Sequence, residues 1–256
     1  MTALNVAAVQ YDIVWFDREA NFELTRPLIG GAVASGAQLV LLPETFSTGF
    51  GFTRPGIGEP EDGPSATFLR EQAAEHGVWV GGSCPEVAPG ADRPSNVFVL
   101  AGPDGTTHRY KKIHPFSHSG EHEHVLAGDQ LVTVEIEGVR VTLFICYDLR
   151  FADEFWATGP GTDAFLVVAN WPAKRRHHWQ TMLRARAIEN QCYVVACNRI
   201  GPDDFDLDHI GDSTAIDPMG NVLVEAAGQQ TVIHATIDTD VVRSTRSHFR
   251  FLQDRR

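Results

Sequence analysis

Cysteine is scarce in this chain of 256 residues, which contains only four, and no two of them form a C-x-x-C pair. That number is too small for the disulfide framework of a small secreted domain, so we expect reduced thiols. Basic residues are also few: the chain has 21 lysines and arginines against 33 aspartates and glutamates, which gives a formal net charge of -12. This charge disfavours binding to nucleic acid or to an anionic membrane surface.

Long hydrophobic runs are missing as well. No stretch approaches the roughly 18 consecutive apolar residues of a membrane-spanning helix, and the N-terminal segment lacks the basic leader of a signal peptide. Together with the expected reduced thiols, these features predict a cytoplasmic protein. The content of 43% hydrophobic and 21% charged residues is ordinary for a globular protein with a sizeable core.

Strand and helix signals alternate along most of the chain, a pattern typical of an α/β layer fold. Apolar segments predict strands at 4–9, 38–42, 78–82, 139–145, 164–169 and 192–197. Capping residues and helical periodicity predict helices at 17–35, 64–76 and 174–190. Turn sequences at 103–105, 137–138 and 217–220 predict further strands joined as hairpins, so the sheets are expected to be mixed.

The sequence shows no internal repeat, low-complexity tract or linker. We therefore expect one domain over residues 1–256. The polar segment 238–256, which carries isolated apolar residues, is expected to be a C-terminal tail that packs on another surface, such as a partner subunit.

Three of the predicted strands run into residues that can take part in catalysis: Glu44, Lys112 and Cys146. Sites of α/β sheets assemble at the carboxyl ends of strands, so these side chains are candidates for one site. A cysteine attacks as a thiolate, for which Glu44 could be the base and Lys112 the cation. Lys112 and the backbone N–H of Tyr147 would then stabilise an oxyanion. From the residues alone, surface charges and a small buried thiol explain the pattern about as well.

The segments around these residues resemble the Glu, Lys and Cys motifs of the carbon-nitrogen hydrolase (nitrilase) superfamily, in the family's order. They are Leu42-Pro43-Glu44-Thr45-Phe46, Tyr110-Lys111-Lys112-Ile113-His114-Pro115-Phe116 and Ile145-Cys146-Tyr147-Asp148-Leu149-Arg150-Phe151. Segments 168–172, 184–191 and 211–213 extend the resemblance to about residue 236. Within the superfamily the chain looks most similar to the omega-amidase branch, particularly the bacterial 2-oxoglutaramate amidases.

The resemblance implies an α/β fold in the form of a four-layer αββα sandwich with two mixed β-sheets, usually paired into a homodimer or a higher homo-oligomer. It also implies roles for four residues. Cys146 is the expected nucleophile, Glu44 the general base and Lys112 the stabiliser of the oxyanion. Glu121 matches a second family glutamate that orients the substrate amide or assists proton transfer, and Glu123 is a close rival for that role.

Lys111 is an adjacent rival for Lys112, but the lysine of the family lies two positions before the histidine, and this selects Lys112. The implied activity is cysteine-dependent hydrolysis of the terminal amide of a small carboxylic monoamide, such as 2-oxoglutaramate to 2-oxoglutarate and ammonia. The reaction passes through a thioester and requires water, with no metal or organic cofactor. The alternative is an N-carbamoyl amino acid hydrolase or another small-amide or nitrile hydrolase of the superfamily. An inactive binding protein is a further alternative, which the intact catalytic set disfavours.

Two further expectations concern the substrate. Tyr147 and Trp171 are assigned to substrate binding. Trp171 is expected to line the pocket, because an aromatic wall excludes water and shapes a small site, although it could equally be core packing. The free carboxylate of an omega-amide substrate needs a cation. Lys174, Arg175 and Arg176 are candidates by position, and we assign Arg175 to this role although the sequence does not separate the three.

Histidines crowd the segment 114–124, where a zinc site is the rival hypothesis from a different class. No second ligand motif of defined spacing supports it, so a solvated or substrate-gating loop is preferred and no metal is expected. Cys84 precedes Pro85, and its thiol could be exposed.

Overall fold

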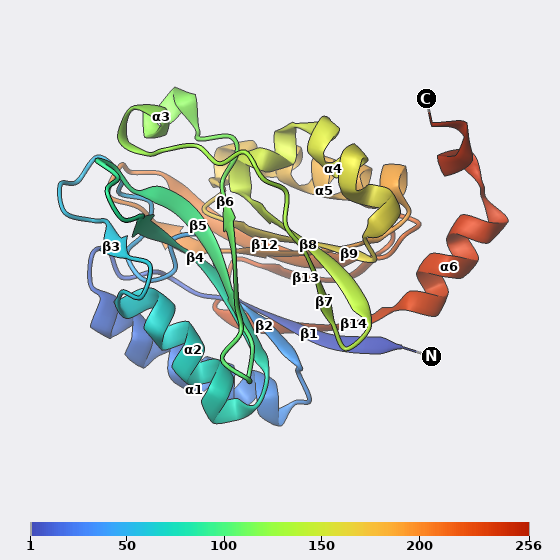
Figure 1. Cartoon of the computed structure of the whole chain (residues 1–256), viewed down its shortest axis with the longest axis horizontal. Helices are drawn as coiled ribbons and strands as arrows, with labels where there is room; N and C mark the ends of the chain where they lie inside the picture. The colour runs from blue at the N-terminus through green and yellow to red at the C-terminus, as the bar shows by residue number, and fades with distance from the viewer. Residues whose placement is uncertain (1, 256) are drawn as a thin grey trace.

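Two mixed sheets of seven strands each form the centre of the protein, and helices cover their outer faces (Figure 1). The computed structural model describes residues 2–255. Met1 and Arg256, the two ends of the expected domain, lie outside the described residues. The arrangement confirms the expected α/β sandwich with two mixed sheets. Among residues 2–255, no helix is long and apolar enough to cross a membrane.

The first sheet is built largely from the N-terminal half of the chain and is completed by the last strand. Its order is β14 (Thr231–Asp238), β1 (Ala3–Gln10), β2 (Leu39–Leu41), β4 (Trp79–Val87), β5 (Ser95–Ala101) and β6 (Thr107–Lys111), with β3 (Glu59–Pro60) beside β4. Helices α1 (Arg18–Ala34) and α2 (Pro64–His76) pack on it.

The second sheet is built from the C-terminal half. Its order is β11 (Ile200–Pro202), β12 (Asp208–Ile216), β10 (Tyr193–Asn198), β9 (Ala164–Ala169), β8 (Val139–Ile145) and β7 (Thr133–Ile136), with β13 (Val222–Ala227) beside β12. Helix α5 (Arg176–Asn190) packs on it and α4 (Ala152–Thr158) packs on α5. The short α3 (Glu121–His124) lies in the loop after β6, and α6 (Thr239–His248) follows β14.

The side chains of β1 alternate between two cores, because successive residues of a strand point to opposite faces. Leu4 and Val6 belong to the core between the two sheets, whereas Ala7 and Val9 pack toward α1 and α2. Both faces of the central strands are therefore buried, which explains why their sequences are continuous apolar runs.

Local signals set most element boundaries within a residue or two of the prediction. The Asp17 side chain caps α1 by accepting the N–H of Ala20 at 3.0 Å, and α2 ends at Gly77, whose φ is 67°. The helix predicted at 174–190 begins only at Arg176, because a turn of 3-10 helix occupies Ala173–Arg175 after Pro172.

One strand is longer than predicted. The segment expected at 78–82 is β4, which continues to Val87 through Pro85 because it pairs along its length with β5. Cys84 therefore lies inside a sheet and is fully buried, so the suggestion that its thiol is exposed was wrong.

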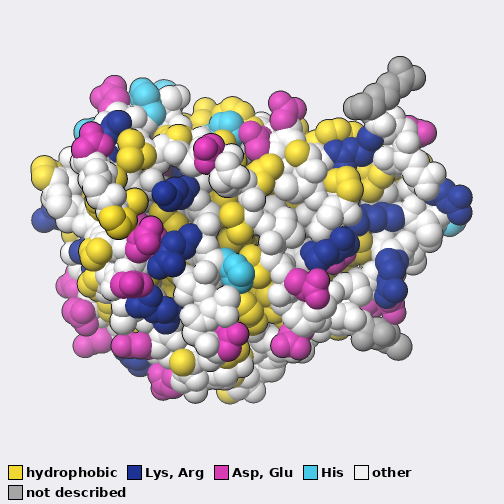
Figure 2. All heavy atoms as spheres, in the orientation of Figure 1, with side chains coloured by type: hydrophobic (Ala, Val, Ile, Leu, Met, Phe, Trp, Pro, Cys, Tyr) yellow, Lys and Arg dark blue, Asp and Glu magenta, His cyan; other side chains and the backbone are white. Residues whose placement is uncertain are grey.

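The last residues form an arm, 239–255, that projects at the side of the sandwich (Figure 1). Arg246 ties this C-terminal arm to the body, because its guanidinium donates to the carbonyl oxygens of Gly159, Thr162 and Asn190. Phe249 on the arm remains 57% exposed. Figure 2 shows basic and apolar side chains gathered along this part of the surface.

Candidate active site

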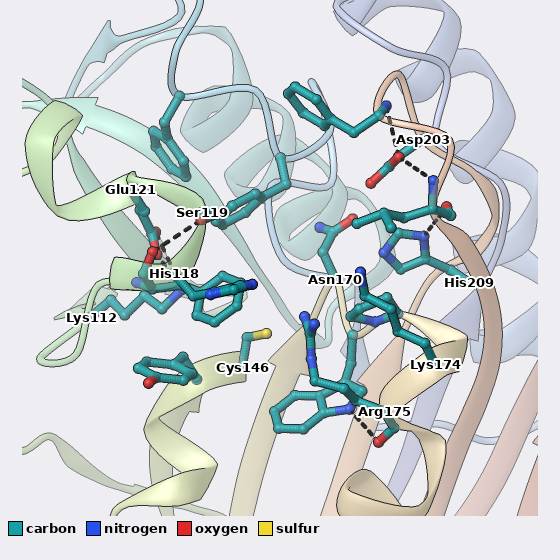
Figure 3. A pocket seen from close by; sticks show the side chains of 18 of the residues that line it. Lys112, His118, Ser119, Glu121, Cys146, Asn170, Lys174, Arg175, Asp203 and His209 are labelled. Carbon is teal, nitrogen blue, oxygen red and sulfur yellow. Dashed lines mark hydrogen bonds and ion pairs between the residues drawn. The ribbon is translucent and has the colours of Figure 1, made fainter.

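Three strand ends from both sheets meet at one pocket. Glu44 follows β2, Lys112 directly follows β6 in the same sheet, and Cys146 directly follows β8 in the second sheet. Lys112 and Cys146 line a cavity of about 280 Å³, and Glu121 from α3 lines it with them (Figure 3). The face-to-face packing of the sheets thus brings together residues that lie far apart in the sequence.

Lys112 is paired with two carboxylates. Its Nζ lies 2.8 Å from Oε1 of Glu44 and 2.9 Å from Oε2 of Glu121. The three side chains are almost completely buried, with at most 1% of any of them exposed. Glu123 and Lys111, the neighbouring rivals for two of these positions, are both exposed instead.

Burial and pairing oppose each other in this cluster. Burial alone would lower the pKa of Lys112, but attraction to Glu121 and Glu44 outweighs it and raises the pKa, so the ammonium stays charged. The pKa of Glu121 is raised by burial and by the charge of Glu44, against the opposing effect of Lys112. The cluster has two carboxyl groups and only one ammonium, so one of the carboxyl groups can accept a proton without leaving Lys112 unpaired.

Backbone and amide groups fix the carboxylate of Glu44. The backbone N–H of Asn170 donates to Oε2 at 2.8 Å, and the side-chain amide of Asn96 donates to Oε1 at 2.8 Å. The Asn170 side chain also donates to the carbonyl oxygen of Glu44. These donors leave the carboxylate little freedom to rotate.

Cys146 sits in a sharp turn between β8 and the 3-10 helix Cys146–Arg150 that follows. Its φ of 44° is in the left-handed region that residues with a side chain rarely adopt. Asp148 holds this turn, because its carboxylate accepts the N–H groups of Ile145 at 3.0 Å and His114 at 2.9 Å. It also accepts the Tyr110 hydroxyl at 2.8 Å. Burial raises the pKa of Asp148 to about 6.

The surroundings of the Cys146 thiol favour its protonated form. Burial raises the pKa of the thiol well above its ordinary value, and the Glu44 charge raises it further, while Lys112 acts in the opposite direction. A thiol in this state needs a base at the moment it attacks. The neighbouring Glu44 carboxylate is in a position to provide one.

Aromatic side chains form much of the pocket wall. Tyr147 packs on Phe116 with a ring-centroid separation of 4.8 Å, and both line the cavity. Trp171 also lines it, and its ring packs on Trp179 with a ring-centroid separation of 5.5 Å. Phe50 covers Lys112, with the ammonium 5.2 Å from the centre of its ring.

The three candidate cations after Trp171 have different surroundings. Arg176 binds Asp212 at 2.7 Å and does not line the pocket. Lys174 and Arg175 do line it, and Figure 3 shows the Arg175 guanidinium directed toward Cys146. Within residues 2–255, no acidic side chain pairs with Arg175, whose pKa is lowered by burial.

Sequence reasoning missed several pocket residues. Arg150 lines the cavity and stacks over Trp171 at 4.8 Å, although it stands inside the quoted cysteine motif and could have been noticed there. Asp203 and His209 come from the β11–β12 hairpin, which no motif pointed to. Asn96, a lone amide at the head of an apolar strand, was the only signal of the buried hydrogen bonds around Glu44.

The histidine-rich segment does not assemble a metal site in the part of the chain that the structure describes, where no cluster of three or more His, Cys, Asp or Glu could hold an ion. His114 instead contacts Glu154 at 2.7 Å, and His118 lines the pocket. Phe116, Ser119 and Glu121 of the same segment line the pocket as well.

Comparison with known proteins gives a consistent result. The carbon-nitrogen hydrolase family model matches residues 5–247. The chain is 37% identical to the omega-amidase YafV of Yersinia enterocolitica, with 99% of this chain and 97% of that protein aligned. It is 32% identical to the 2-oxoglutaramate amidase of Bacillus subtilis, with 91% and 90% aligned.

A solved structure from the same superfamily is also similar to this chain. XC1258 of Xanthomonas campestris, described as a CN-hydrolase superfamily protein with an arsenic adduct in its active site, is 36% identical and superposes with a TM-score of 0.94. The match covers 100% of this chain and 98% of that one.

Proposed function

The chain belongs to the carbon-nitrogen hydrolase family and is a cysteine-dependent amidase, and from this premise we propose that its substrate is a small dicarboxylic monoamide such as 2-oxoglutaramate. The product would be the dicarboxylate, with ammonia released. The observation that carries the proposal is the Arg175 guanidinium, which lacks an acidic partner among the described residues and faces the pocket beside Cys146. The free carboxylate of the substrate would supply that partner.

In the first half of the proposed reaction, Glu44 takes the thiol proton while the sulfur of Cys146 attacks the amide carbon. The carbonyl electron pair moves onto oxygen, where the Lys112 ammonium and the backbone N–H of Tyr147 stabilise the negative charge. Collapse of this intermediate breaks the carbon–nitrogen bond. The proton held by Glu44 leaves with the nitrogen as ammonia, and the acyl group remains on sulfur as a thioester.

In the second half, a water molecule takes the place of the ammonia. Glu44 accepts a proton from this water as its oxygen attacks the thioester carbon. The carbon–sulfur bond then breaks, the sulfur of Cys146 takes the proton back from Glu44, and the acid product leaves and loses its own proton to solvent. Glu121 is assigned to orienting the amide, since it lines the pocket while bound to Lys112. Nucleophile, base and oxyanion donors all come from the chain, so these steps require no cofactor.

The pocket supports the assignment of three substrate-binding residues. Tyr147 and Trp171 would form the apolar walls around the short carbon chain, and Arg175 would bind the distal carboxylate. Two anchored ends, the amide at Cys146 and the carboxylate at Arg175, would select for the length of the molecule between them.

The test is ammonia release from a small panel: 2-oxoglutaramate, 2-oxosuccinamate, glutamine, an N-carbamoyl amino acid and a simple nitrile. Each is assayed with the wild type and with Cys146→Ala. Turnover of the oxo-amides that depends on Cys146 is the expected result. A preference for the carbamoyl compound or the nitrile would move the substrate to another branch of the family and overturn this assignment.

We also propose that the enzyme acts in the cytoplasm as a homodimer or a higher homo-oligomer. The four cysteines are free and buried, which suits a reducing compartment. The C-terminal arm offers an exposed apolar surface, with Val241 and Phe249 37% and 57% exposed, near which Met219 is 57% exposed. Light scattering after size-exclusion chromatography tests the oligomer. A monomer at micromolar concentration would contradict it.

A further inference from the structure

Asn96 contacts three of the proposed catalytic residues at once. Its side-chain nitrogen lies 2.8 Å from Oε1 of Glu44 and 3.2 Å from Oε1 of Glu121. Its backbone carbonyl accepts the N–H of Lys112 at 2.9 Å. The residue is completely buried, so water does not compete for these bonds. Nothing in the expected mechanism assigns it a role.

A second hydrogen-bonded pair determines which way the Asn96 amide points. Ser83 Oγ accepts the backbone N–H of Thr45 at 2.9 Å, and its own proton is donated to Oδ1 of Asn96 at 2.8 Å. Because Oδ1 is bound to Ser83, the NH₂ group must face the two carboxylates. In the pairing of β4 with β5, Ser83 lies opposite Phe98 and Asn96 lies opposite Pro85, so Ser83 and Asn96 are diagonal neighbours on the same face of the sheet.

Without hydrogen-bond donors between them, the carboxyl groups of Glu44 and Glu121 would compete for the same proton. Two buried carboxyl groups close together tend to share a proton, and the pair then titrates as a unit. Here Oε1 of Glu44 and Oε1 of Glu121 both accept from the same two donors, the Asn96 amide and the Lys112 ammonium. Donors therefore satisfy the oxygen atoms that would otherwise share a proton.

We propose that Asn96 is a positioning residue that keeps Glu44 and Glu121 from sharing a proton, so that Glu44 is free to accept the proton of Cys146. Lys112 supplies the charge for this arrangement, and Asn96 supplies one N–H to each carboxylate. The inference rests on the proposed function and extends it to a residue that touches no reacting atom.

The test is the pH dependence of kcat/KM for ammonia release by Asn96→Ala. A carboxylate that loses an N–H donor holds its proton to higher pH. The pH below which activity falls should therefore move upward by about one unit, which is a tenfold loss of rate on the acid side. We expect kcat to fall more than KM rises. A residue with a purely structural role would lower the rate by the same factor at every pH.

Ser83→Ala is a milder variant, and it provides the test if Asn96→Ala does not fold. It keeps the NH₂ group but frees the amide to turn, so the shift should have the same direction and be smaller. Asn190→Ala is the matched control, because Asn190 is also completely buried but bonds to Arg186 and Glu189, away from the pocket. Its pH profile should coincide with that of the wild type.

A second measurement separates failure of this inference from failure of the proposed function. Infrared absorbance of protonated carboxyl groups, followed against pH without substrate, should persist to higher pH in Asn96→Ala than in the wild type. If wild-type enzyme releases no ammonia from the panel, the function fails and the infrared titration still decides the role of Asn96. Unshifted activity and infrared profiles in both variants would overturn the inference alone.

Discussion

Lys112 Nζ lies 2.8 Å from Oε1 of Glu44, although the two residues are 68 positions apart in the chain. Both side chains are buried, with exposures of 1% and 0%. A pair of this kind contributes little net stability when intact, but removal of one partner leaves an uncompensated charge in the interior. The same contact thus ties the proposed catalytic role of these residues to the integrity of the fold.

The substitution Lys112→Met should therefore lower both the activity and the stability of the protein. We expect no detectable ammonia release, because the oxyanion loses its cation, and a free energy of unfolding lower by about 3 kcal/mol. Urea denaturation at neutral pH measures the second effect. The double variant Lys112→Met/Glu121→Gln should regain part of the stability and none of the activity. Stability equal to wild type in Lys112→Met would show that the carboxylates are not held as described.

Cys146→Ala and Cys146→Ser should abolish turnover and leave the protein folded. Neither change adds bulk to the turn, and alanine and serine meet the same backbone strain at a φ of 44° as the native residue does. Ammonia release and thermal unfolding are measured side by side. Ammonia release near the wild-type rate in either variant would contradict the proposed nucleophile.

Arg175→Ala should raise KM for 2-oxoglutaramate by about tenfold or more, because a charge-assisted hydrogen bond to the substrate is lost. The kcat should change much less, and a neutral amide of similar length should be unaffected. Arg176→Ala is the control, since that arginine binds Asp212 and not the pocket. Equal losses for charged and neutral amides would remove Arg175 from carboxylate recognition.

Glu86 offers a test of pH-dependent stability away from the pocket. Burial raises the pKa of this carboxyl from 4.5 to about 7, against the opposing effect of Arg109, which lies 3.0 Å away. The folded state binds the proton more tightly than the unfolded chain, so stability should fall as pH rises from about 4.5 to about 7. The loss is at most about 3 kcal/mol.

In Glu86→Gln this part of the pH dependence should vanish. Urea midpoints at pH values below and above this range, compared between wild type and variant, provide the measurement. An unchanged difference between the two pH values would mean that Glu86 titrates as an ordinary exposed carboxyl group.

Strand ends, which are recognisable from apolar runs, made Glu44, Lys112 and Cys146 candidates for one site, and the resemblance to the carbon-nitrogen hydrolase motifs then selected them. The sequence also located most strands, since central strands buried on both faces are continuous in hydrophobicity. The Leu39–Leu41 and Val139–Ile145 strands illustrate this, as each lies within one residue of the range expected. The apolar pattern located only the first part of β4, at 78–82. It missed the continuation through Pro85, which depends on pairing with β5.

Lys174, Arg175 and Arg176 could not be separated from the sequence alone. Asp212, on a strand 36 positions after Arg176, binds that arginine, whereas Lys174 and Arg175 both line the pocket. Asn96 was overlooked for a similar reason. The Asn96 side chain contacts Glu44 and Glu121, which are 52 and 25 positions away in the chain. A single amide in a strand has no local sequence pattern that would predict these contacts.

The antiparallel pairing of β1 with β14 has a consequence for the synthesis of this enzyme. Ala3 pairs with Asp238 and Gln10 with Thr231, so the sheet that supplies Glu44 and Lys112 is complete only when nearly the whole chain has left the ribosome. A nascent chain that already exposes Cys146 therefore still has an open edge along β1. The strand that closes this edge is therefore synthesised after every residue of the proposed catalytic set.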